Sequence, residues 1–218
     1  MNKVQALLFD FDGVILDTYE SYRQIVVDVL LDMGYEISLQ DAVKRWKGLN
    51  AEQIATELTF EGFAKADEFL KVVHEKSKNY TVEKSMIVDG LLEILETCDL
   101  PKAICSNGRS IRLKSNLADV FLENHFAEVV GRDIAGNMKP NPDVYLIGAE
   151  RLGMEIENCL AVEDSAVGLQ AAVESGAITV AFTGTGGKSE ELEALNPDYI
   201  IDDLAKILNI IEELNNGN

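Results

Sequence analysis

Two aspartates separated by a single residue, Asp10 and Asp12, are the residues of this chain best suited to chemistry. They follow a short apolar run at residues 6–9 and precede Gly13, which allows the backbone to turn sharply. Two carboxylates this close repel each other unless a cation or a shared proton lies between them. Carboxylate oxygens are the hard ligands that Mg²⁺ prefers. An Asp-Gly turn at a strand end is also a common structural feature, so this motif alone leaves both roles open.

Three later segments carry further reactive side chains, and each comes after a predicted strand. They are Ser106-Asn107-Gly108, Lys139-Pro140 and Glu163-Asp164-Ser165. In an open parallel sheet, ligands bind at the carboxyl ends of the strands. If these strands are neighbours, one hydroxyl, one amine and four carboxylates share one edge of the sheet. Each segment alone also fits a structural role, such as an exposed loop lysine or a helix N-cap, but together they indicate a functional site.

The elements that must position these residues alternate between strand and helix. Apolar runs predict strands at 6–9, 102–105, 127–130, 159–162, 178–182 and 199–201. Helical periodicity fills the intervals at 91–98, 110–117, 142–152, 166–175 and 204–214. This alternation predicts an α/β fold, a Rossmann-like doubly wound parallel sheet with helices on both faces.

A different pattern covers residues 17–86, where helical periodicity occurs without a convincing strand. Ser38 and Asn50 are both expected to be helix N-caps. We therefore predict an all-helical cap domain at 17–86, inserted after the first strand, and a catalytic core formed by 1–16 and 87–218.

The composition and charge of the chain restrict the binding partners that we expect for it. The 218 residues carry a formal net charge of −19, which argues against nucleic acid and anionic membranes because the long-range field repels polyanions. The three cysteines have no CxxC spacing and are interpreted as reduced thiols, largely buried. The start of the chain is too short for a signal peptide, and no apolar run approaches the length of a membrane span. We expect a cytoplasmic monomer.

A glycine-rich segment at 184–189 invites comparison with a phosphate-binding P-loop. The motif GxxxxGK[ST] requires glycine at position 182, which is Phe182. The segment also follows a late strand rather than the first. We interpret it as a flexible loop between a strand and a helix.

In chain order, the motifs around Asp10, Ser106, Lys139 and Glu163 resemble the four motifs of the haloacid dehalogenase superfamily. The resemblance is to the subgroup that contains β-phosphoglucomutase and small sugar-phosphate phosphatases. It covers nearly the whole chain, including the helical cap inserted after the first motif. Four ordered motifs at domain-scale spacing make chance agreement improbable.

The resemblance implies a role for each motif. Asp10 is expected to be the nucleophile that forms an aspartyl-phosphate, and Asp12 to act as general acid and then general base. Ser106 and the amide of Asn107 are expected to hold phosphoryl oxygens. Lys139 is expected to neutralise those oxygens and to steady Asp10.

The resemblance also implies the cofactor Mg²⁺. Its expected ligands are Asp10, the backbone carbonyl of Asp12 and Asp164, with Glu163 nearby or in the outer shell. Further contacts to the substrate are expected from Gly13, Asn107, Gly108, Lys47 and Arg109. Of these, Lys47 from the cap and Arg109 from the core are the candidates for a distal anionic group.

Three functions remain open from the sequence. The preferred one is a phosphomonoester hydrolase for a small phosphorylated metabolite, a sugar phosphate or phosphosugar acid. A mutase of the β-phosphoglucomutase type would carry a histidine and an arginine in the cap at positions that Tyr22 and Ala51 occupy here. A non-catalytic binding protein would be expected to lose Asp10 or Asp12, and both are present.

Overall fold

The chain folds into two compact units of unequal size. The computed structural model describes residues 3–47, 49–77, 80–185 and 189–217. Met1–Asp17 together with Glu83–Asn218 form the larger unit, and Thr18–Val82 form the smaller one. The division expected from the sequence, at 17 and 86, lies one and four residues away from these boundaries.

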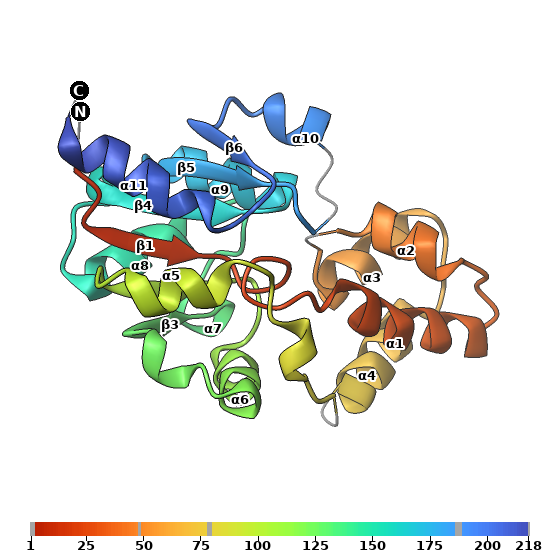
Figure 1. Cartoon of the computed structure of the whole chain (residues 1–218). Helices are drawn as coiled ribbons and strands as arrows, with labels where there is room; N and C mark the ends of the chain where they lie inside the picture. The colour runs from red at the N-terminus through yellow and green to blue at the C-terminus, as the bar shows by residue number, and fades with distance from the viewer. Residues whose placement is uncertain (1–2, 48, 78–79, 186–188, 218) are drawn as a thin grey trace. The chain divides into compact units, whose positions relative to one another are not determined.

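The larger unit is built on a six-stranded sheet in the order β3-β2-β1-β4-β5-β6 (Figure 1). All neighbouring strands in it are parallel. The strands are β1 (Ala6–Phe9), β2 (Lys102–Cys105), β3 (Glu128–Val130), β4 (Cys159–Glu163), β5 (Ile178–Phe182) and β6 (Tyr199–Ile201). The predicted doubly wound parallel sheet is confirmed, with β1 near its centre.

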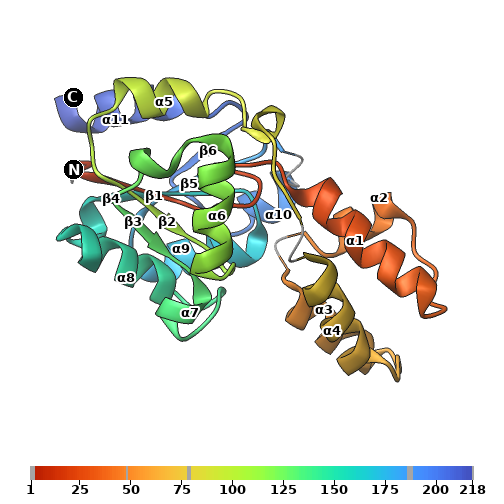
Figure 2. The same ribbon diagram turned by 90° about the horizontal axis from the view of Figure 1, so that it is seen from below.

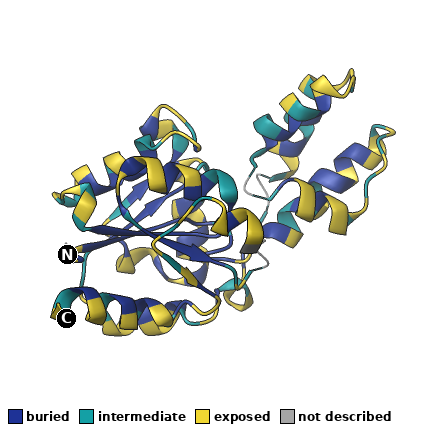
Figure 3. Cartoon of the chain, turned by 90° about the horizontal axis from the view of Figure 1, so that it is seen from above, coloured by how far each residue is buried: buried dark blue, intermediate teal, exposed yellow. Residues whose placement is uncertain are grey.

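Helices cover both faces of this sheet. In Figure 2, α5 (Leu91–Thr97) and α11 (Lys206–Asn216) lie along one face, and α8 (Asp143–Leu152) and α9 (Ala166–Ser175) lie along the other. The strands are almost entirely buried, while the helices show exposed outer faces (Figure 3). This burial on both faces explains why the strands are continuous apolar runs in the sequence.

The remaining helices of the larger unit are short or lie beside β3. They are α6 (Ser110–Val120), α7 (Arg132–Ala135), α10 (Ser189–Glu193) and three 3₁₀ turns, η1 (Lys84–Met86), η2 (Glu123–His125) and η3 (Ile156–Asn158). The sequence analysis did not predict α7 or α10, because four or five residues are too few to show helical periodicity.

The strand register places the reactive segments at one edge of the sheet. Phe9 pairs with Ile104 of β2 and with Val162 of β4. The next residue, Asp10, donates its N–H to Val162 O at 3.0 Å. The first residues after β1, β2 and β4 therefore emerge side by side at their carboxyl ends.

The smaller unit is helical, as its periodicity predicts. It contains α1 (Tyr19–Asp32), α2 (Leu39–Arg45), α3 (Ala51–Phe60) and α4 (Ala66–Ser77). Ser38 caps α2 by accepting from Asp41 N–H at 3.1 Å, and Asn50 forms a capping box with Gln53.

Across the described ranges, no helix combines the length and the apolar character that a membrane crossing requires. Cys105 and Cys159 are buried, as expected, whereas Cys98 is half-buried.

Candidate active site

The centre of the site is a buried ion pair between Asp10 and Lys139. Asp10 follows β1 and is 8% exposed, and Lys139 is 3% exposed. Lys139 Nζ lies 2.6 Å from Asp10 Oδ1 and 2.7 Å from the carbonyl oxygen of Cys105, the last residue of β2. Lys139 is therefore not an exposed loop lysine. Its ammonium joins the ends of two neighbouring strands.

Glu163 completes this buried cluster from the end of β4. It is fully buried and forms an ion pair with Lys139. Tyr145 donates its hydroxyl to Glu163 Oε1 at 2.6 Å, and Tyr145 OH also lies 3.1 Å from Lys139 Nζ. Glu163 is thus held in place by α8 as well as by the sheet.

The burial and charges of this cluster shift its titration. Burial, followed by the nearby Glu163 charge, raises the pKa of Asp10 to about 7, although Lys139 opposes the shift. Burial would lower the pKa of Lys139, but Asp10 and Glu163 together raise it above its ordinary value. Burial and the Glu163 charge hold the pKa of Tyr145 well above its usual range. The negative charge of the carboxylates in this cluster therefore exceeds the single positive charge of Lys139.

Three carboxylates could hold a cation. Oxygens of Asp10, Glu163 and Asp164 lie within 4.8 Å of one another, and all three residues are buried. Asp164 Oδ2 lies 3.1 Å from Thr185 Oγ1, which donates to the Gly13 carbonyl at 2.8 Å. This all-oxygen donor set, with its excess of negative charge, fits Mg²⁺. Glu163 contacts Lys139 and Tyr145 through Oε1 and accepts from Ser165 Oγ at 3.3 Å through Oε2, whereas Asp10 meets Lys139 through Oδ1. Asp10 and Asp164 therefore fit direct ligation better than Glu163 does.

The loop after β2 is fixed to Lys139 by Asn107. Asn107 Oδ1 accepts from Lys139 N–H at 2.8 Å, and Asn107 Nδ2 donates to Lys139 O at 3.3 Å. Ser106 is buried, and its hydroxyl accepts from Gly108 N–H at 3.0 Å. The loop is therefore held at the same edge of the sheet as Asp10, and the Ser106 hydroxyl can still donate a hydrogen bond to an anion there.

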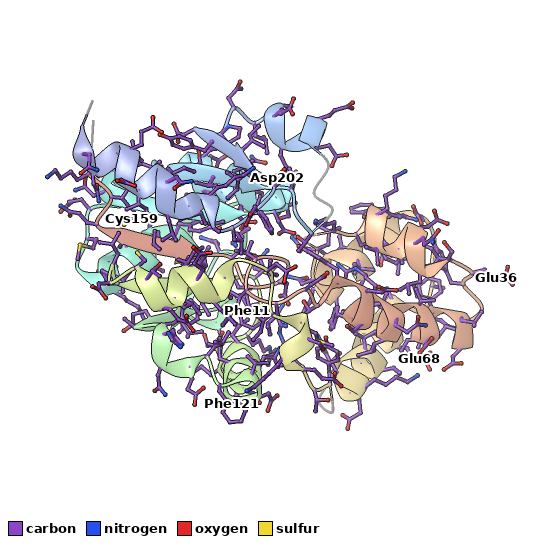
Figure 4. All side chains as sticks on the ribbon, in the orientation of Figure 1. Phe11, Glu36, Glu68, Phe121, Cys159 and Asp202 are labelled. Atoms are coloured by element: carbon purple, nitrogen blue, oxygen red, sulfur yellow. The ribbon has the colours of Figure 1, made fainter. Side chains whose placement is uncertain are left out.

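Asp12 forms an ion pair with Arg112, a residue that the sequence analysis did not identify. Its carboxylate pairs with Arg112 of α6, with Nη1 3.1 Å from Oδ1 and Nη2 2.6 Å from Oδ2. Phe11, which separates the two aspartates in the sequence and is labelled in Figure 4, is fully buried. Gly13 follows with φ of +95°, a conformation that suits glycine.

Two further substrate contacts were predicted, one in each unit. Arg109 is exposed at the N-cap of α6, one helical turn before Arg112. Lys47 belongs to the smaller unit, where its ammonium lies 4.8 Å from the centre of the Tyr19 ring. Both remain expectations as substrate contacts.

The sequence analysis missed three residues at the site: Arg112, Tyr145 and Thr185. Arg112 could have been found from the predicted helix, because it lies three residues after Arg109. Tyr145 gives no signal beyond its place in a predicted buried helix. Thr185 lies in the glycine-rich segment that was interpreted as a flexible loop; residues 186–188 of that segment are outside the described ones.

Comparison with known proteins assigns the family. The model of the haloacid dehalogenase-like hydrolases matches residues 7–182, which include all four motifs. This chain is a haloacid dehalogenase-like hydrolase. The resemblance drawn from the motifs is thereby confirmed.

Individual relatives are also similar to this chain in sequence or in fold. The chain is 30% identical over 179 residues to fructose-1-phosphate phosphatase YqaB of Escherichia coli, covering 78% of this chain and 92% of the relative. It is also 30% identical over 217 residues, 94% of this chain, to SUPPRESSOR OF QUENCHING 1 of Arabidopsis thaliana, but spans only 20% of that protein. A solved β-phosphoglucomutase of Clostridium difficile has the same fold, with a TM-score of 0.79, 20% identity, and 98% and 97% of the two chains covered.

Proposed function

We propose that this protein is a Mg²⁺-dependent phosphomonoester hydrolase for a small phosphorylated metabolite, acting through an aspartyl-phosphate. The phosphatase class follows from the family and from the phosphatase names of its relatives. The observation that carries the finer proposal is the buried Lys139–Asp10 pair among three clustered carboxylates. A sugar phosphate or phosphosugar acid is the preferred substrate, because YqaB is named for fructose 1-phosphate.

In the first half of the reaction, a carboxylate oxygen of Asp10 attacks phosphorus while the ester P–O bond breaks. Asp12 gives its proton to the leaving alkoxide. Ser106 and the backbone amide of Asn107 bind phosphoryl oxygens, and Lys139 balances the charge of Asp10. The nucleophile reacts as a carboxylate, the form that the positive charge of Lys139 favours against burial and the Glu163 charge, which both raise the pKa of Asp10.

In the second half, water attacks phosphorus and Asp12 takes the proton that the water loses. The bond between phosphorus and Asp10 breaks, inorganic phosphate leaves and the carboxylate is restored. Mg²⁺ bound by Asp10, Asp164 and the Asp12 carbonyl would reduce the repulsion between carboxylates and phosphate. Lys139 and Tyr145 meanwhile keep Glu163 in place beside this set of ligands.

The test is release of inorganic phosphate by the purified protein with Mg²⁺. p-Nitrophenyl phosphate is the general probe, and a panel of sugar phosphates and phosphosugar acids identifies the substrate class. We expect turnover with Mg²⁺, none with excess EDTA, and phosphate rather than an isomeric sugar phosphate as product. Absence of phosphate release across the panel, or an isomerised product, would contradict the proposal.

A further inference from the structure

We infer that Arg112 is a positioning residue, whose guanidinium fixes the carboxylate of Asp12 for proton transfer. This inference rests on the proposed hydrolase function, in which Asp12 serves both halves of the reaction. Neither the four motifs nor the family match singles out position 112.

The pairing is bidentate. Nη1 and Nη2 of Arg112 meet Oδ1 and Oδ2 of Asp12 at 3.1 and 2.6 Å, so the planar fork fixes the plane and direction of the carboxylate. The two side chains are 30% and 29% exposed, well below a freely solvated surface pair. Each carboxylate oxygen has two lone pairs, so the fork leaves one on each oxygen for a proton.

The surroundings of Arg112 favour this one arrangement. Its guanidinium lies 5.6 Å from the centre of the Phe11 ring, which is fully buried. Gly108 is also close to the guanidinium: a Cβ atom at this position would collide with Nη2 of Arg112 and would come within 2.9 Å of Leu113 Cδ2. The absence of a side chain at position 108 therefore leaves the space through which Arg112 reaches Asp12.

Positioning of Asp12 has a distinctive kinetic consequence. A sugar alkoxide needs a proton as the ester bond breaks, whereas p-nitrophenolate is a stable anion that leaves without one. Formation of the aspartyl-phosphate from p-nitrophenyl phosphate should therefore tolerate a misplaced Asp12. Breakdown of the intermediate needs Asp12 to accept a proton from water, whichever substrate formed it.

The experiment compares Arg112→Ala with wild type on two probes, p-nitrophenyl phosphate and the best sugar phosphate of the panel. We expect kcat/KM for the sugar phosphate to fall about 10–100-fold, and kcat/KM for p-nitrophenyl phosphate to change little. We also expect kcat to fall for both probes, with a pre-steady-state burst of p-nitrophenol. Lys114→Ala is the matched control, because it removes an exposed cation from the same helix.

Two further variants separate positioning from charge and from folding. Arg112→Lys keeps the charge without the fork, and should recover only part of the sugar phosphate activity. Arg112→Gln keeps a polar side chain that is uncharged and too short for the fork, and it tests the effect again if the alanine variant melts early.

Equal losses of kcat/KM on both probes would overturn the inference and make Arg112 a phosphate anchor instead. An unchanged ratio in folded Arg112→Gln and Arg112→Lys would also overturn it and leave a structural ion pair. Failure of the proposed function is a separate outcome, because wild type itself would then release no phosphate.

Discussion

At the scale of single residues, the cluster around Asp10 combines three carboxylates with one ammonium, all buried. Burying an unpaired charge is costly, so such a cluster persists only with compensating partners. Lys139 contacts both Asp10 and Glu163, and Tyr145 donates to Glu163. The remaining excess of negative charge is what a divalent cation would neutralise.

Asp10→Asn should abolish turnover while leaving the fold intact. The amide keeps the shape of the carboxylate but is a poor nucleophile, so kcat should fall at least about a hundredfold. Phosphate release and a far-UV circular dichroism spectrum check the two halves of this prediction. A variant that retains more than about a hundredth of wild-type activity would rule out Asp10 as the nucleophile.

The raised pKa of Asp10 predicts how stability depends on pH in metal-free protein. An unfolded Asp titrates near 3.8 and the folded one near 7, so the folded state binds more protons between these values. The contribution of Asp10 to the free energy of unfolding is therefore complete below about pH 4 and is lost as the pH rises through about 7. It amounts to at most about 4 kcal/mol, at about 1.4 kcal/mol per pKa unit.

Denaturant melts of wild type and Asp10→Asn in EDTA, from pH 5 to pH 8, measure this contribution. The asparagine variant lacks the ionisation, so its free energy of unfolding should rise relative to wild type as the pH increases. A difference that stays constant over this range would contradict the raised pKa of Asp10.

At the scale of elements, the site depends on how closely α9 approaches the end of β4. Ser165 caps α9 by accepting from Gly168 N–H at 3.1 Å, and the Glu163 carboxylate lies directly against Gly168. A Cβ atom at position 168 would overlap that carboxylate. The first turn of α9 therefore needs glycine to leave room for Glu163.

Gly168→Ala should lower both stability and activity, against the usual preference of helices. Alanine normally stabilises a helix interior by about 1 kcal/mol relative to glycine. Here it would displace a fully buried carboxylate from Lys139 and Tyr145, which costs about 1–3 kcal/mol or more. Thermal melts and phosphate release measure the two effects.

Gln170→Ala on the exposed face of α9 is the control for Gly168→Ala. It should leave activity unchanged, because that residue bonds to Glu174 and not to the cluster. A Gly168→Ala protein that is more stable and fully active would show that Glu163 moves freely.

At the scale of the whole molecule, two chain crossings join the units, between Asp17 and Thr18 and between Val82 and Glu83. The larger unit contains every member of the carboxylate cluster, and the smaller unit contains Lys47. Metal binding should therefore be a property of the larger unit. Recognition of the distal part of the substrate is the role we propose for the smaller one.

Mg²⁺ should stabilise the wild-type protein against heat. A ligand at a hundred times its dissociation constant adds about 2.7 kcal/mol, which corresponds to roughly 5–10 °C in Tm for a chain of this size. Asp164→Asn should lose most of this shift, and EDTA should reverse it in wild type. An equal shift in both proteins would place the bound cation elsewhere.

Lys47→Ala should weaken recognition of the natural substrate by about 1–3 kcal/mol in kcat/KM. The protein carries a net charge of −19, so an anionic substrate needs local cationic groups, and Lys47 is our candidate. p-Nitrophenyl phosphate has neither a distal anionic group nor sugar hydroxyls and should be turned over normally. Equal losses on both substrates, or no loss on either, would contradict this role for Lys47.

The sequence by itself determined the sheet and the residues that leave its carboxyl edge. The apolar runs could be assigned as strands because strands buried on both faces tolerate few polar residues. Parallel pairing then brings the carboxyl ends of β1, β2 and β4 together, so Asp10, Ser106 and Glu163 could be grouped without coordinates. Helix caps such as Ser38 and Asn50 could also be predicted, because capping is a local interaction.

Only the tertiary structure decided which side chains pair within the site. Lys139 meets Asp10 across 129 positions of sequence, and Arg112 meets Asp12 across 100. No local preference encodes such contacts, which depend on helix phase and on close approaches at glycine. Arg109 and Arg112 illustrate this dependence, because they are one turn of α6 apart. Arg109 is exposed, whereas Arg112 reaches Asp12 past Gly108.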